Sequence, residues 1–100
     1  MLVRKPAIAG TLESSDVQVS VEPSESGLKL TIDSIVMNQY GPQIKQVVTK
    51  TLEELDVINA VVRVVDRGAL DCTIRARVQC AVFRSCDASH ENIPWKGAVR

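Results

Sequence analysis

The sequence predicts an α+β two-layer domain: a mostly antiparallel four-stranded sheet with two helices on one face, in the order β-β-β-α-β-α. Three observations lead to this fold. Apolar and polar residues alternate in the first third of the chain, the apolar spacing then changes to three and four, and a β-branched run precedes a long segment without Gly or Pro. The length of 100 residues, 45% of them hydrophobic, suits one domain over residues 1–100.

Three strands are predicted in the first third of the chain. Residues 7–12 are short and extended in character, and apolar side chains alternate with polar ones over residues 17–22 and 28–33. The polar residues 13–16 suit a hairpin turn, and residues 23–27 form a second turn or loop. We therefore predict a three-stranded antiparallel meander whose second face is polar.

A helix and a buried strand follow. Gly41-Pro42 favours a helix start, because proline is tolerated at the first helical position, and the helix should end near Asp56. Residues 57–65 are dense in β-branched side chains and predict a more deeply buried strand. The helical stripe consists of Ile44, Val47, Val48, Leu52 and Leu55.

Residues 69–86 fit either a strand or a helix by periodicity. About eighteen residues without Gly or Pro are long for a strand and ordinary for a helix, so length favours a helix. This helix would carry a second apolar strip, which suggests contact with its own sheet and with a partner. The strip consists of Cys72, Ala76, Cys80 and Phe83.

Composition excludes several classes of protein. Twelve basic and twelve acidic residues balance, so the chain has no electrostatic footprint for nucleic acid or for an anionic membrane. No apolar run approaches the length of a membrane span, and the N-terminus does not resemble a secretory signal. The cysteines are odd in number and form no CxxC pair, which indicates reduced thiols in a cytoplasmic protein and no metal site. They are Cys72, Cys80 and Cys86.

The sequence offers no catalytic constellation. His90 is the only histidine and lies in a tail that we predict to be irregular, where a solvated surface role is expected. The glycines are scattered at turns and form no phosphate-binding loop. Arg75, Arg77 and Arg84 could bind phosphates, although a solvated helix face is the simpler interpretation.

The stretch GTLESSD, residues 10–16, places two hydroxyls in a polar turn with no base near them in sequence. Such a turn is most often only a turn. The specific alternative is that one serine is a substrate, exposed at a loop tip for a separate transferase that supplies its own base. Glu13 and Asp16 would lie at the tip and could mark it for a basic partner surface.

Longer blocks of the chain resemble a known family. PAIAGTLESSDVQV at residues 6–19 and DRGALDCTIRARVQ at residues 66–79 are similar to the two recurring blocks of the acyl carrier subunit (gamma chain) of bacterial citrate lyase. The short IPW at residues 93–95 is similar to that family's tail. The resemblance spans nearly the whole chain, and the paired blocks are its specific part.

The resemblance implies a non-catalytic carrier. Its Ser14 would bear 2'-(5''-triphosphoribosyl)-3'-dephospho-CoA, a covalent phosphoribosyl-dephospho-CoA arm linked by a phosphodiester. Ser15, where the family more often has glycine, is the less favoured attachment residue. The arm's thiol would carry acetyl and citryl groups between an alpha (acyltransferase) and a beta (citryl lyase) subunit, so that citrate becomes acetate and oxaloacetate. A tethered substrate meets each partner at high effective concentration.

Two other functions stay open. One is a carrier of the same kind in malonate decarboxylase. In that family the turn that bears the serine would have a different amino-acid sequence. The other is an unmodified protein-interaction domain, for which Ser14 would be dispensable.

Overall fold

The computed structural model describes residues 2–35 and 37–86, without the side chains of residues 37–40. His90, Trp95 and the predicted irregular tail lie outside these residues. None of the described helices is both long and apolar enough to cross a membrane. The elements are β1 (Ala7–Gly10), β2 (Val17–Pro23), β3 (Leu28–Ser34), α1 (Met37–Glu54), β4 (Ala60–Asp66) and α2 (Asp71–Ser85).

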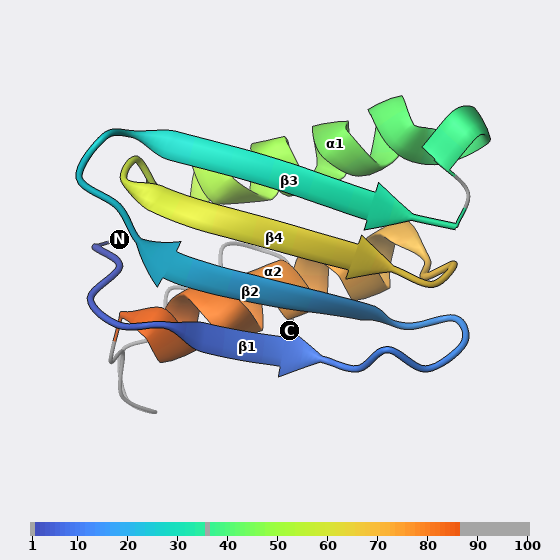
Figure 1. The fold of residues 1–100 in the computed structure, drawn as a ribbon, viewed down its shortest axis with the longest axis horizontal. Coiled ribbons are helices and arrows are strands. Elements are labelled where there is room, and N and C mark those ends of the chain that lie inside the picture. The colour runs from blue at the N-terminus through green and yellow to red at the C-terminus, as the bar shows by residue number, and fades with distance from the viewer. Residues whose placement is uncertain (1, 36, 87–100) are drawn as a thin grey trace.

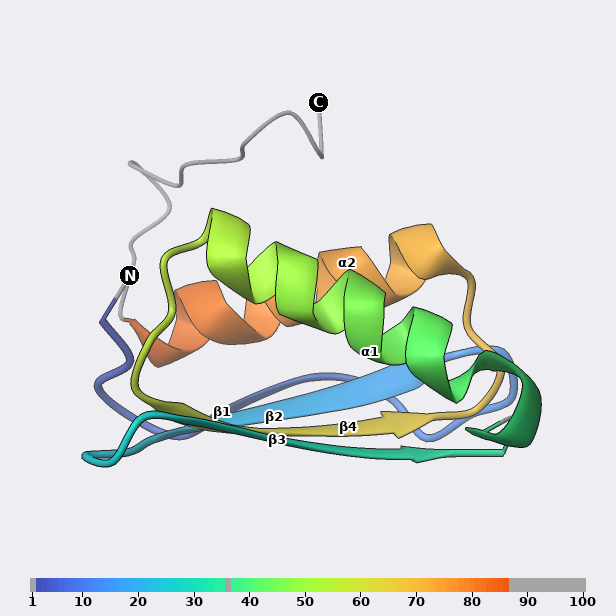
Figure 2. The same ribbon diagram turned by 90° about the horizontal axis from the view of Figure 1, so that it is seen from above.

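The sheet has the strand order β1-β2-β4-β3, and both helices lie on one of its faces (Figures 1 and 2). β2 pairs antiparallel with both β1 and β4, whereas β3 pairs parallel with β4. This confirms the predicted fold class, including the element order and the mostly antiparallel sheet.

The predicted meander is wrong in one respect: β2 and β3 do not pair, because β4 lies between them. Neighbouring strands are about 4.8 Å apart, so the short loop at residues 24–27 can cross over one intervening strand. β4 is the most continuously apolar strand, and the central position gives its backbone partners on both sides. A helix between β3 and β4 also makes them natural parallel neighbours.

The core lies between the sheet and the helices. Val17, Val19 and Val21 of β2 are fully buried, and they face the same layer as the buried residues of β4. The helices close this layer with Ile44, Val48, Leu52 and Leu55 of α1 and Ile74, Val78, Ala81, Val82 and Phe83 of α2. The two apolar periodicities seen in the sequence therefore meet in one aliphatic core.

α1 begins earlier than predicted. The helix starts at Met37, and Pro42 lies inside it. Proline removes one backbone donor, but here only one turn precedes it, so few helical hydrogen bonds depend on its position. The predicted stripe is otherwise confirmed, since its Ile44, Val48 and Leu52 are buried.

α2 confirms the helical interpretation of residues 69–86. The predicted second strip is only partly available: Phe83 is buried in the core, Cys80 is half-buried, and only Cys72 and Ala76 are exposed. The buried Gln79 was not anticipated from its polar side chain.

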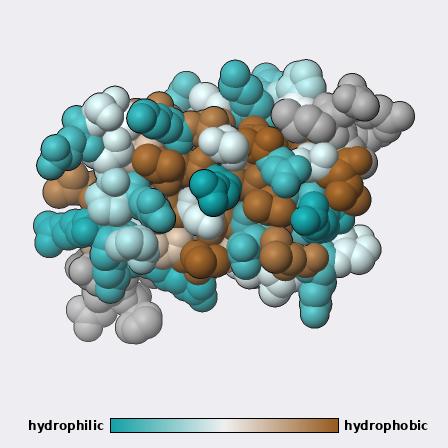
Figure 3. All heavy atoms as spheres, in the orientation of Figure 1, coloured by the Kyte–Doolittle hydropathy of each residue, from teal (hydrophilic) through white to brown (hydrophobic). Residues whose placement is uncertain are grey.

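The open face of the sheet is less polar than predicted. Figure 3 views the molecule from this side and shows hydrophobic and hydrophilic residues side by side. Arg63 is exposed there, while Val61 and Val65, its β4 neighbours on the same face, are half-buried.

Replacing Leu70 by serine should stabilise the protein. Leu70 occupies the N-cap of α2 without a side-chain hydrogen bond, and its side chain is 72% exposed. A serine hydroxyl there can accept a backbone N–H of the first turn, which contributes about 1 kcal/mol to the free energy of unfolding. Urea denaturation measures this change. Ile58→Ser is the matched control, because Ile58 is 70% exposed and caps no helix, and its effect should stay within about 0.5 kcal/mol.

Candidate functional site

The predicted turn is a loop of residues 11–16 between β1 and β2, at the end of the sheet where β4 leads into α2 (Figure 1). The backbone N–H of Ser15 donates to the carbonyl of Arg67 at 2.8 Å, and the N–H of Arg67 donates to the carbonyl of Asp16 at 2.9 Å. Both sequence blocks that resemble the family, residues 6–19 and 66–79, therefore meet here. The loop is fixed at its base by a segment some fifty residues away.

Asp16 organises the loop from within. Its Oδ2 accepts the hydroxyl of Thr11 at 2.6 Å and the backbone N–H of Thr11 at 3.1 Å, and its Oδ1 accepts the N–H of Val17 at 2.7 Å. Arg77 of α2 adds an ion pair at 3.2 Å between Nε and Oδ1. The Thr11 hydroxyl, then the Val17 N–H, and more weakly Arg77 lower the pKa of Asp16 from 3.8 to about 2, against the opposing effect of partial burial.

This inward role was not predicted, because Asp16 was expected to mark the loop tip for a partner. An aspartate directly before a strand, five residues after a threonine, was the available signal, since such side chains often bond nearby backbone N–H groups. Of the two acids flanking the serines, Glu13 is exposed.

Two residues of this region have left-handed backbone conformations. Gly10, the last residue of β1, has a φ of +88°, and Ser15 has a φ of +65°. A Cβ on Gly10 would lie 1.8 Å from the carbonyl oxygen of Val17, so only glycine fits there. The glycine ends β1 and lets the loop begin against the start of β2.

The two serines differ in the work they do for the fold. Both are exposed, but Ser15 occupies the strained position and donates its backbone N–H to Arg67. Among the described residues, none hydrogen-bonds to the hydroxyl of Ser14. Ser14 therefore presents an exposed hydroxyl at the tip of the loop, and backbone hydrogen bonds to Arg67 hold the base of that loop.

The left-handed conformation of Ser15 predicts that Ser15→Gly stabilises the protein. Glycine adopts this φ without the steric cost that a side chain incurs, although it also loosens the unfolded chain, so the net gain should be about 0.5 kcal/mol. Thermal unfolding measures it. Ser14→Gly is the control, because the positive-φ residues of the described chain do not include Ser14, and it should destabilise or leave the melting temperature unchanged.

The three candidate phosphate-binding arginines are engaged within the protein. Arg75 pairs with Glu54 of α1 at 3.0 Å, Arg77 pairs with Asp16, and Arg84 donates to the backbone carbonyl of Ile8 at 2.7 Å. They join α2 to α1, to the serine loop and to β1. Each of the three therefore makes an intramolecular contact that the solvated-face interpretation did not include, although Arg84 is exposed as that interpretation expected.

The described part of the chain contains neither a cluster of metal-ligating side chains nor a disulfide. Within residues 2–35 and 37–86, no three His, Cys, Asp or Glu side chains gather as a metal site. The cysteines are free thiols: Cys72 is exposed, and Cys80 and Cys86 are half-buried.

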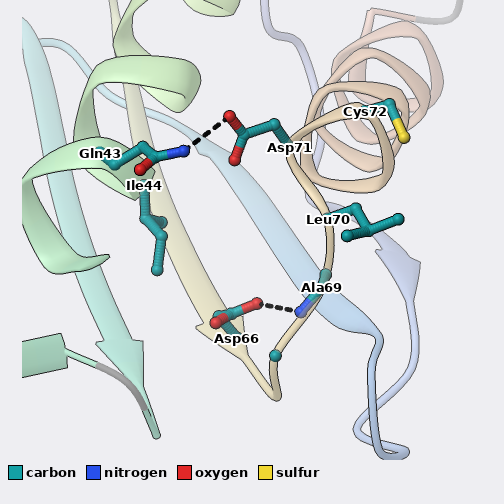
Figure 4. Close-up of a pocket in the computed structure, with 8 residues that line it drawn as sticks. Gln43, Ile44, Asp66, Ala69, Leu70, Asp71 and Cys72 are labelled. Carbon is teal, nitrogen blue, oxygen red and sulfur yellow. Dashed lines mark hydrogen bonds between the residues drawn. The ribbon is translucent and has the colours of Figure 1, made fainter. Parts of the chain in front are cut away.

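A hollow of about 550 Å³ lies beside the serine loop, between the first half of α1 and the start of α2 (Figure 4). Across it, the Gln43 amide donates to the Asp71 carboxylate at 2.9 Å. Deeper in, the buried Asp66 accepts the Ser34 hydroxyl at 2.8 Å and the Ala69 N–H at 2.9 Å. Among the described residues, the hollow is lined by Gln43, Ile44, Asp66, Gly68, Ala69, Leu70, Asp71 and Cys72. Sequence reasoning gave no sign of this hollow, because its residues come from two distant segments.

Comparison with known proteins shows that the relatives of this chain are named as carrier proteins. The family model described as "Malonate decarboxylase delta subunit (MdcD)" matches residues 4–85. The citrate lyase acyl carrier protein of Vibrio cholerae is 53% identical over 95% of this chain and 96% of its own length. The corresponding proteins of Pectobacterium atrosepticum and Lacticaseibacillus casei are 50% and 47% identical, each over 96% of this chain and over 98% and 93% of their own lengths.

A solved structure has the same fold. A chain of a Pseudomonas malonate decarboxylase hetero-tetramer, crystallised in complex with malonate, superposes with a TM-score of 0.72 at 20% identity, covering 82% of this chain and 84% of that one. At this identity the likeness concerns the fold alone.

Proposed function

Because this chain belongs to the citrate lyase acyl carrier protein family and is a non-catalytic carrier subunit, we propose that Ser14 is the residue that holds its acyl-bearing group. The group proposed is a phosphoribosyl-dephospho-CoA arm, joined to the Ser14 oxygen by a phosphodiester. When bound, it would supply a thiol that carries acetyl and citryl groups as thioesters.

The observation that carries the proposal is the state of the Ser14 hydroxyl. It is exposed at the loop tip, and among the described residues no hydrogen bond to it is found. A separate transferase that supplies its own base can therefore reach it. Ser15 is exposed as well, and it is the less favoured attachment residue because the resembling family more often has glycine at this left-handed position.

The loop also suits a negatively charged attachment. Of its two carboxylates, Asp16 is turned inward and paired with Arg77, so Glu13 alone among the loop's acids is exposed beside Ser14. A phosphodiester at Ser14 then meets less repulsion than two free carboxylates would give. The neighbouring Arg67 is tied to the loop by both its backbone groups, so a cationic residue belongs to the same end of the sheet.

The proposed partners are an alpha (acyltransferase) subunit, a beta (citryl lyase) subunit and the transferase that attaches the arm, all in the cytoplasm. The chain's own part would be to present the tethered group on a rigid base, as one domain of residues 1–100. Complex membership is in keeping with the names of its relatives.

Ser14→Ala should abolish attachment of the arm. The intact mass of the protein, produced together with its native citrate-fermentation enzymes, should include a large added group that is wholly absent from the variant. Ser15→Gly is the matched control, because it removes the second hydroxyl while keeping the left-handed turn, and it should retain the group.

The other results would be as informative. Loss of the added mass in Ser15→Gly only would keep the function and move the site to Ser15. No added mass in the wild-type protein, with the transferase shown to be active, would leave an unmodified interaction domain.

A carrier role in malonate decarboxylase is the second candidate. The matching family model and the superposed structure both bear that enzyme's name. The 47–53% identities to citrate lyase carriers, against 20% to the malonate decarboxylase chain, favour citrate. Reconstitution with each enzyme's partner subunits distinguishes the two.

A further inference from the structure

From the hollow between α1 and α2 we infer a resting place for the arm: its neutral, amide-containing segment folds back and docks there when no partner engages it. The inference rests on the function proposed for Ser14. It assigns a role to residues 43–44, 66 and 68–72, which the attachment site itself does not use.

Position supports this occupant first. The serine loop is hydrogen-bonded to both backbone groups of Arg67. The two residues that flank Arg67 in the chain, Asp66 and Gly68, line the hollow. A flexible group fixed at Ser14 is therefore confined to the neighbourhood of this opening. Such confinement gives the group a high local concentration, so that weak contacts are enough for docking.

The lining matches a slender chain of amides and methyl groups. Ile44 and Ala69 provide apolar surface inside the hollow and Leu70 provides it at the rim, and the Gln43 amide with the Asp71 carboxylate provides groups that can hydrogen-bond to amides. In Figure 4 these two polar side chains point toward each other across the hollow, while Leu70 and Cys72 point outward at its rim. The hollow is thus a mostly apolar site with a few convergent polar groups.

Charge defines which part of the arm fits. Asp66 and Asp71 both line the hollow, and within the described part of the chain no Lys or Arg does. A phosphate or a carboxylate-bearing acyl group would meet repulsion here, whereas a neutral amide segment with a free thiol or a small neutral acyl group would not. Docking should therefore be selective: an acetyl-bearing arm can rest in the hollow and a citryl-bearing arm stays outside.

Substitution of Leu70 tests directly whether the arm docks in the hollow. The side chain of Leu70 is 72% exposed, and the packed fold leaves this large apolar group at the rim. Leu70→Ser removes that surface while providing a helix cap, so weakened docking cannot be ascribed to a destabilised fold. Ile58→Ser removes an equally exposed side chain, 70% exposed, between α1 and β4 and away from the hollow's lining.

The experiment compares backbone amide NMR spectra of the full chain with and without the arm, with loading verified by intact mass. Amides of the serine loop should shift in any loaded protein. The amides of Gln43, Ile44, Ala69 and Asp71 should shift only if the arm docks. In loaded Leu70→Ser the docked-to-free ratio should fall about tenfold, because a large apolar contact is lost, whereas loaded Ile58→Ser should resemble the wild type.

Each outcome decides something distinct. Shifts confined to the serine loop in a fully loaded protein would overturn the docking inference and leave the carrier function intact. Equal shifts at the hollow in Leu70→Ser and wild type, or equal shifts with acetyl and citryl loading, would also overturn it. Absence of any loading in the presence of active transferase would refute the function and, with it, the inference.

Discussion

Gly10→Ala is expected to destabilise the protein by about 3 kcal/mol or more and to slow attachment of the arm at Ser14. The residue has a φ of +88°, and an added Cβ would lie 1.8 Å from the Val17 carbonyl oxygen. That oxygen belongs to the backbone at the start of β2, so relief requires the loop base to move. Urea denaturation measures the loss of stability, and intact mass against time measures the loading rate.

Gly27→Ala separates the clash from the backbone conformation. Gly27 has a similar φ of +95°, but a Cβ there would meet no atom within 4 Å. It should cost only about 1 kcal/mol and leave loading at Ser14 unchanged. Equal losses in the two variants would mean that the close approach of Gly10 to Val17 does not constrain the loop.

Asp16→Asn is expected to cost about 2–3 kcal/mol at pH 7. Both carboxylate oxygens accept hydrogen bonds, from Thr11, Val17 and Arg77, and an amide offers only one accepting oxygen. The serine loop should loosen at its base as a result. Asp33→Asn is the control, because Asp33 is an exposed residue of β3, and its effect should be within about 0.5 kcal/mol.

The same contacts predict how stability depends on pH. The pKa of Asp16 lies at about 2 in the folded protein and at 3.8 ordinarily, so the unfolded chain binds the proton more readily between these values. The stabilisation is therefore complete above about pH 4 and is lost as the pH falls through about 2. The difference between wild type and Asp16→Asn, measured by urea denaturation from pH 7 to pH 2, should shrink over that window. A constant difference would contradict the role assigned to the charge.

The sequence was a sufficient guide to the layers of the fold. The alternating valines at 17–22 and the spacing of three and four from Ile44 to Leu55 are local periodicities. The apolar face that each of them predicts, one on β2 and one on α1, is buried. The position of β4 between β2 and β3 was missed. Strand order depends on which strand is stabilised most by a central, buried position and on where the helix between β3 and β4 returns the chain. The apolar periodicity of a single segment reports neither.

The proposed attachment residue could be named from the sequence. A polar turn that bears serine hydroxyls is a local feature, and the residues around it resemble one family. What holds that turn is a different matter. Arg77 reaches Asp16 across sixty-one residues, and Arg67 meets Ser15 at the end of the sheet where β2 and β4 pair. The hollow likewise forms only when α1 and α2 come together. The sequence by itself determined the elements and the candidate serine. Only the tertiary structure decided what fixes the loop and what lies beside it, because these contacts join segments whose spacing carries no local signal.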